Sequence, residues 1–305
     1  MKNLQIIQIV KLIVIFLSFW FIGKKLLLHQ SWLISSAFNI NIMILIFVCS
    51  IIYCLTEFLL SFAWKRLLIF CGHGNISQKK CNKIYGQSQI AKYIPGNIFH
   101  VLGRHFLGSQ AGIKHEVLTG ATVYEILGLT YTSLIISFIG IALFKLENIY
   151  FTLYQIIFCI IAVLILIILI IYLVPYLMKL RGINMLKYNF WESLVIISKI
   201  YLFYFIFFFI SGLLLVLISS LFLDITYSNL GTIISIFAIS WFMGFIIPGA
   251  PGGIGIRETV IIYLITPVVG EAESIVIAIS LRLITLIGDI WFFLLSKKIF
   301  FRTKS

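Results

Sequence analysis

The sequence predicts an all-α, polytopic membrane protein with about six full spans and two oppositely oriented re-entrant broken-helix units. Hydrophobic residues make up 62% of its 305 residues and charged residues 11%, with a mean hydropathy of +1.14. This composition leaves too little polar surface for a water-soluble globule. Long apolar runs recur along the chain, and two of them are interrupted by Pro-Gly followed by an arginine nine residues after the first proline.

The six full spans are predicted from apolar runs near or above the ~20 residues that cross a bilayer. They are residues 5–22, 39–62, 119–144, 150–177, 193–223 and 274–295. The first run is followed by no small-residue cleavage site, so we interpret it as a retained span rather than a signal peptide.

The net charge of +13 would suggest a nucleic-acid partner in a soluble protein. Here Lys and Arg instead cluster in short loops beside apolar spans, as the positive-inside rule describes, so no nucleic acid is expected. The densest basic loop, residues 65–83, is predicted to be cytoplasmic, and loop 224–231, which has no Lys or Arg, to lie outside. This gives a multi-pass protein of the cytoplasmic membrane with both termini in the cytoplasm.

The two interrupted runs are predicted to be broken helices. Proline and glycine cannot continue an ordinary helix, and hydrocarbon cannot satisfy the backbone groups that are freed. The first unit, residues 84–108, should enter from the cytoplasmic side and the second, residues 232–265, from the outside. We therefore expect a single transmembrane domain, residues 1–305, with inverted-repeat halves at about 39–144 and 190–298, whose broken helices meet near the membrane midplane.

Each broken unit could form part of an anion site. A helix that restarts after the glycines would offer unpaired N–H groups, and arginine can bind a phosphate with two hydrogen bonds. The predicted head-group site comprises Pro95, Gly96, Arg104, Pro248, Gly249, Pro251, Gly252, Gly253, Arg257 and Glu258. The alternative is that Pro and Gly only kink helices for packing and that each arginine extends to the membrane interface.

Ionisable residues within predicted spans are the second signal, because each costs about 2.5–3.5 kcal/mol at the bilayer centre. Glu57, Glu125, Arg282 and Asp289 are these residues, and we assign them to gating or charge pairing. Two interpretations stay open. They could form structural ion pairs, for example Glu125 with Arg282 or Arg104, or a carboxylate could take up a proton as an anionic substrate moves.

Other reactive residues carry weaker signals. Cys71, His73 and Cys81 are too loosely spaced to predict a metal site, and His100, His105 and His115 more often only form hydrogen bonds. Gln89 and Lys92 could touch a head group or lie on a solvated cytoplasmic face. The sequence has no motif of a catalytic site or nucleotide loop, so we expect neither enzymatic activity nor a cofactor. An enzyme that modifies lipid within the membrane stays open as a third interpretation, which a covalently changed lipid product would support.

The stretch Gly86–Gly96 with Gly103-Arg104, and the stretch Pro248–Glu258, resemble the flippase-like family named for the transmembrane region of lysylphosphatidylglycerol synthase. Trp64 with Leu67-Leu68, and Arg282, also match. In bifunctional members of that family a soluble aminoacyltransferase domain follows the membrane region, which moves the aminoacylated phospholipid across the bilayer. Because this chain stops at Ser305, the synthase activity is not expected here.

The resemblance implies a membrane transporter for an anionic lipid, either an aminoacyl-phospholipid or a polyprenyl-phosphate-linked sugar. Stand-alone members resemble accessory proteins of envelope polysaccharide assembly. The alternative is therefore a scaffold that holds a glycosyltransferase or lipid-synthesis enzyme without moving lipid.

Overall fold

The computed structural model describes residues 20, 23–25, 27–28, 40–94, 98–144, 189–247 and 250–301, and within these the regular structure is helical with no strand. Six helices of this part of the chain are long and apolar enough to cross a membrane. The predicted all-α polytopic fold is therefore confirmed. Most of predicted span 5–22 and all of span 150–177 lie outside the described residues.

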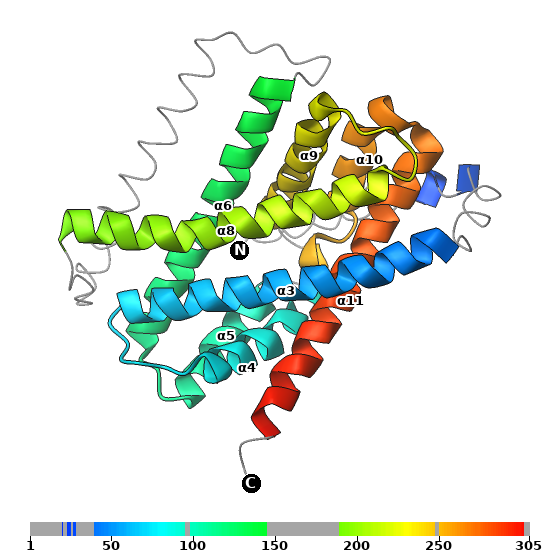
Figure 1. Cartoon of the computed structure of the whole chain (residues 1–305). Coiled ribbons are helices and arrows are strands. Elements are labelled where there is room, and N and C mark those ends of the chain that lie inside the picture. The colour runs from blue at the N-terminus through cyan, green and yellow to red at the C-terminus, as the bar shows by residue number, and fades with distance from the viewer. Residues whose placement is uncertain are drawn as a thin grey trace, which may run out of the picture.

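The first half of the chain places a broken hairpin between two long helices (Figure 1). In order these are α3 (Ile40–Phe70), α4 (Gln78–Gln89), η1 (Ile90–Tyr93), α5 (Phe99–Gln110) and α6 (His115–Phe144). The structure begins α4 six residues before the predicted start at residue 84, because the Ser77 side chain accepts the N–H of Lys80 and caps the helix.

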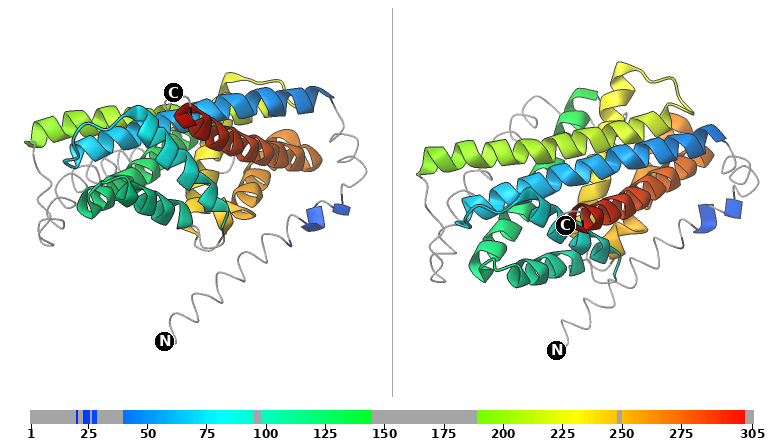
Figure 2. Two further views of the ribbon diagram at one scale, coloured as in Figure 1. Left: turned by 90° about the horizontal axis from the view of Figure 1, so that it is seen from below. Right: turned by 60° about the horizontal axis from the view of Figure 1, so that its bottom comes forward.

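The second half has the same order of elements. It consists of α8 (Phe190–Ser219), α9 (Tyr227–Ile246), η2 (Pro251–Gly253), α10 (Ile256–Val269) and α11 (Glu271–Phe301). The long helices α3 and α8 lie side by side and run in opposite directions, and α11 packs along α3 (Figure 2). This order and the opposed directions are consistent with the inverted repeat, and the equivalence of halves 39–144 and 190–298 stays a prediction.

The second break requires glycine. Gly252, Gly253 and Gly255 have φ angles of 55°, 74° and 86°, a region that side chains with a Cβ disfavour. After them α10 has 14 residues, about 21 Å at 1.5 Å per residue. Residues 229–246 of α9 and residues 251–269 of η2 with α10 each reach the length of a candidate span, so two of the six candidate spans are the arms of the second broken unit rather than predicted full spans.

The two broken hairpins meet inside the bundle, where η1 packs against η2. A Cβ added to Gly252 would lie 3.5 Å from the Lys92 carbonyl oxygen, so the two backbones approach closely. Helix α11 packs against both α4 and α10 and so joins the two hairpins. The chain segments that bear the predicted site residues are therefore brought together.

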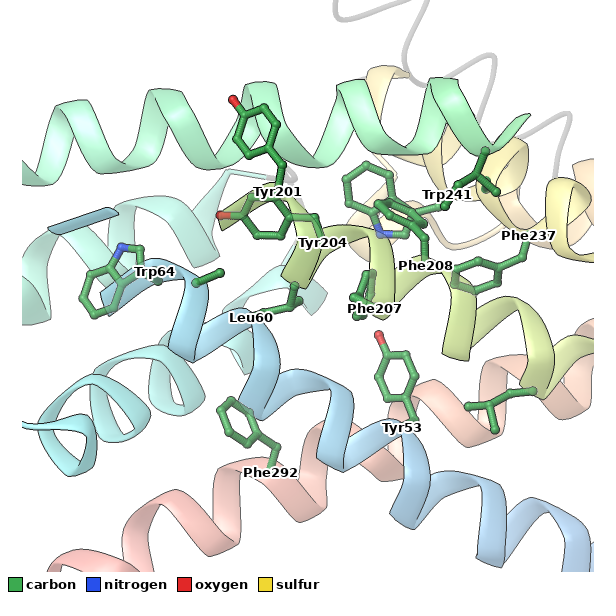
Figure 3. Packing of buried hydrophobic residues seen from close by; sticks show 14 of the residues in the cluster. Tyr53, Leu60, Trp64, Tyr201, Tyr204, Phe207, Phe208, Phe237, Trp241 and Phe292 are labelled. Atoms are coloured by element: carbon green, nitrogen blue, oxygen red, sulfur yellow. The ribbon is translucent and has the colours of Figure 1, made fainter. Parts of the chain in front are cut away.

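Aromatic side chains fix the helices around this meeting point. Figure 3 shows Tyr53 and Leu60 of α3 pointing toward the aromatic residues of α8, whereas the Trp64 ring packs against that of Tyr85 on α4. Phe208 of α8 packs edge-on against Trp241 of α9, with ring centroids 5.0 Å apart at 90°. Such pairs favour an edge-to-face arrangement, which holds Trp241 in place beside the second break.

Candidate functional site

A cavity of about 70 Å³ lies where the broken hairpins meet. A single water needs about 10–15 Å³ of such space, so the cavity has room for several waters or one small polar group. Its lining comprises Tyr53, Glu57, Leu60, Tyr85, Gln89, Lys92, His100, Val101, Arg104, Glu125, Ile126, Leu129, Phe207, Trp241, Phe245, Gly252 and Arg257. Charged groups from α3, α5, α6, α10 and η1 thus share one enclosed space within the bundle.

Arg104 of α5 faces the cavity but is neutralised by its surroundings. Its Nη1 contacts both carboxylate oxygens of Glu125 on α6, and Arg104 is only 4% exposed. The Tyr85 hydroxyl donates to Oε1 of Glu125 at 2.7 Å, and the Arg104 guanidinium lies 3.7 Å from the centroid of the Tyr85 ring. This is one of the two ion pairs that the sequence left open for Glu125, and the alternative with Arg282 is not seen.

Asp289 of α11 is fully buried and paired with residues of η1. Nζ of Lys92 lies 2.7 Å from Oδ2 and 2.8 Å from Oδ1 of Asp289, and the Tyr93 hydroxyl donates to the same carboxylate. This contact ties the first broken unit to the last long helix.

Arg282, seven residues earlier on α11, holds the second broken unit. Its Nη1 donates to the Gly252 carbonyl oxygen at 3.2 Å, and its Nε lies 3.3 Å from Oε1 of Glu258. Oε2 of Glu258 accepts the N–H of Gly255 at 2.7 Å, so Glu258 caps α10. One of the N–H groups expected to be free at the start of this helix, that of Gly255, is therefore taken by the chain's own carboxylate.

Arg257 differs from the other cations of the site. Within the described residues it has no carboxylate within 4 Å, and its buried Nε has no hydrogen-bond partner. Its guanidinium lies 5.6 Å from the centroid of the Trp241 ring. Arg257 lines both the central cavity and a smaller one of about 20 Å³ beside Glu258 and Arg282. It thus offers the cavity a positive charge that forms no ion pair with the described residues.

The glycines around Arg257 make room for its side chain. A Cβ at Gly244 would lie 2.5 Å from Cγ of Arg257, and a Cβ at Gly253 would lie 2.7 Å from its Nε. Since real Cβ atoms do not approach so closely, the position of this guanidinium depends on both glycines.

Glu57 of α3 is fully buried and also lines the cavity. Its Oε2 accepts a hydrogen bond from Nε2 of Gln89 at 3.0 Å, whereas its Oε1 has no partner in the described part of the chain. Nη2 of Arg104 donates to Oε1 of Gln89 at 3.5 Å, so Gln89 separates the Glu57 carboxylate from that arginine.

Most of the predicted site residues are gathered here, namely Glu57, Arg104, Glu125, Pro251, Gly252, Gly253, Arg257, Glu258, Arg282 and Asp289. Pro95, Gly96, Pro248 and Gly249 lie outside the described residues. Gln89 and Lys92, for which the sequence left a solvated face open, are hydrogen-bonded in the cavity. The sequence did not predict Tyr85 and Trp241 as site residues. Only their position on the helix that precedes each break could have indicated them.

The part of the chain that the structure describes contains no group of three or more His, Cys, Asp or Glu placed to hold a metal ion. His100 lines the cavity. His105 and His115 lie apart from it, with Nε2 of one ring 2.9 Å from Nδ1 of the other.

These features define a polytopic helical membrane protein with two broken hairpins around a charged internal cavity. Residues 8–291 match the family described as "Lysylphosphatidylglycerol synthase TM region". The chain belongs to this family, as its motifs suggested. The search of curated proteins gave no match.

Proposed function

We propose that this protein moves a lipid with an anionic, phosphate-bearing head group across the cytoplasmic membrane, both of its termini lying in the cytoplasm. The observation that carries the proposal is the charge of Arg257, which faces an internal cavity and has no carboxylate within 4 Å in the part of the chain that the structure describes. A charged group at this depth is costly, and it is retained where it binds a substrate. The planar guanidinium suits two oxygens of one phosphate.

A lipid fits this site better than a free anion. The outer faces of the described helices expose large apolar side chains, such as Phe47, Leu102 and Tyr263, which suit contact with acyl chains. A head group could therefore occupy the cavity while its chains stay in hydrocarbon. Aminoacyl-phospholipids and polyprenyl-phosphate-linked sugars share the phosphate that Arg257 would bind.

The three ion pairs would act as the gate. Arg104 with Glu125 joins α5 to α6, Lys92 with Asp289 joins η1 to α11, and Arg282 with Glu258 joins α11 to α10. Each pair joins a broken hairpin to a long helix. Exchange of these partners would let one hairpin move while the buried charges stay paired.

The test is reconstitution of the full chain in liposomes that contain a fluorescent phosphatidylglycerol or a short polyprenyl-phosphate-linked sugar. Reduction of the outer-leaflet dye reports transbilayer movement. We expect activity in the wild type and its loss in Arg257→Ala. The matched control is Lys199→Ala, which removes an exposed cation of α8 that does not line the cavity and should keep full activity.

Equal movement in wild type and Arg257→Ala would overturn the site. Failure of the purified wild type to move any of these lipids, together with a stable enzyme partner in pull-downs, would favour the scaffold function instead.

A further inference from the structure

The carboxylates of the site are not equivalent. Glu125, Glu258 and Asp289 each contact a cation within 4 Å. Glu57 has no such cation within the described residues, although it is fully buried and its Oε1 has no hydrogen-bond partner. A bare buried carboxylate is unfavourable unless something neutralises it.

The charges of the site balance before any substrate binds. Lys92, Arg104, Arg257 and Arg282 are the cations, and Glu57, Glu125, Glu258 and Asp289 are the carboxylates. An anion bound at Arg257 would therefore add one negative charge to an enclosed space of low dielectric. Neutralising Glu57 would restore the balance.

The groups that face Glu57 do not already neutralise it. Lys92 of η1 and Asp289 of α11 lie nearby but pair with each other. Tyr53 and Cys54 lie beside it on α3, with the neutral Tyr53 hydroxyl in hydrogen-bonding reach of the carboxylate, and Tyr85 faces it from α4. Helix α8 contributes the apolar Phe207 to this part of the cavity. Gln89 supplies a neutral hydrogen bond.

We propose that Glu57 binds a proton when an anionic head group occupies the cavity at Arg257, so that anion binding is coupled to proton uptake. This inference rests on the proposed function, which supplies the anionic lipid head group that occupies the cavity. In this step the Glu57 carboxylate takes one proton from water that reaches the cavity and becomes a carboxylic acid, and no other bond changes. Of the four carboxylates, Glu57 is the one whose protonation breaks no ion pair.

The experiment measures proton uptake directly. Dioctanoyl-phosphatidylglycerol is titrated into the purified full chain by calorimetry, in buffers of equal pH but different ionisation enthalpy. Above the pKa of Glu57 the wild type should take up close to one proton per lipid bound, and its affinity should fall about tenfold per pH unit, because the proton is bound only in the complex.

Glu57→Gln mimics the protonated form and should bind the same lipid with no proton uptake and with affinity independent of pH. Glu57→Asp keeps a carboxylate and should keep the uptake, which guards against a folding defect in the first variant. The matched control is Glu116→Gln, an exposed carboxylate at the start of α6, which should behave as the wild type.

Two outcomes would overturn the proposal. One is the same proton uptake in Glu57→Gln as in the wild type, or binding by the wild type without uptake. The other is that Glu57→Gln loses only the binding of amine-bearing lipids, which would make Glu57 a site for the head-group ammonium. If Arg257→Ala binds the lipid as tightly as the wild type, the proposed function itself fails, and this result is distinct from both.

Discussion

Arg104 and Arg257 both lie nine residues after the proline of a Pro-Gly break, yet the structure surrounds them differently. Arg104 is enclosed by Glu125, Tyr85 and Gln89, and the Glu125 carboxylate compensates its positive charge. Arg257 faces Trp241 and has no carboxylate partner among the described residues.

The difference comes from the helices that pack against each break. Helix α6 places Glu125 opposite Arg104, whereas α9 places Gly244 and Trp241 opposite Arg257. The two similar motifs thus have different surroundings: the first arginine forms an ion pair with Glu125, and the second forms none within the described residues. The sequence predicts both as head-group ligands, and our proposal assigns that role to Arg257.

The largest effect that would test this comparison is on stability. Arg104→Ala leaves the Glu125 carboxylate buried and unpaired, so we expect a loss of about 3–5 kcal/mol in the free energy of unfolding. Arg257→Ala breaks no ion pair of the described residues and should cost about 1 kcal/mol or less, the value of its contact with Trp241. Reversible unfolding in mixed detergent micelles measures both.

The double variant Arg104→Ala, Glu125→Ala supplies the control. Because it removes both charges, it should recover part of the stability that the single variant loses. Equal destabilisation by Arg104→Ala and Arg257→Ala would show that the two arginines are both structural.

The second effect is on lipid binding. It tests whether the absence of a side chain at Gly244 is needed for the position of the Arg257 guanidinium. In Gly244→Ala the new Cβ would displace the guanidinium, so lipid affinity should fall about 10- to 100-fold, the equivalent of about 1.5–3 kcal/mol for a charge-assisted hydrogen bond. The helix itself should tolerate alanine, which has a higher helix propensity than glycine. Binding is measured by calorimetry with dioctanoyl-phosphatidylglycerol.

Gly103→Ala is the matched control on the first broken unit. Its Cβ would lie 3.7 Å from Cβ of Ser88, an ordinary contact, so affinity should not change. A similar loss of affinity in both variants would mean that the glycines matter for helix packing in general rather than for the position of Arg257.

The fold followed from features that a sequence displays directly. The apolar runs predicted the long helices, because in a membrane a helix is one of the few structures that hydrogen-bond every backbone N–H and C=O group. The Pro-Gly stretches gave the breaks, and the second is confirmed by the positive φ angles of Gly252, Gly253 and Gly255. Helix starts were less certain because they depend on single caps, as Ser77 shows for α4.

The partners of the charged residues could not be derived in the same way. The residues of an ion pair such as Lys92 with Asp289 stand 197 positions apart, and only tertiary packing sets their register. A solvated cytoplasmic face was one prediction for Gln89 and Lys92, because their neighbours in the sequence are basic and polar. In the structure, the turn at η1 directs them inward instead.

The smallest effect concerns Glu258, the acidic residue beside Arg257. Gln at this position can still accept the N–H of Gly255 and cap α10, but it cannot neutralise Arg282. We expect Glu258→Gln to lose about 1.5–3 kcal/mol of stability, less than Arg104→Ala, because Arg282 loses a charged partner but keeps its hydrogen bond to the Gly252 carbonyl oxygen. The same change adds one uncompensated positive charge beside the cavity, so affinity for an anionic lipid should rise severalfold. Calorimetry with dioctanoyl-phosphatidylglycerol tests this, and an unchanged or lower affinity would show that the charge of Arg282 does not reach the ligand of Arg257.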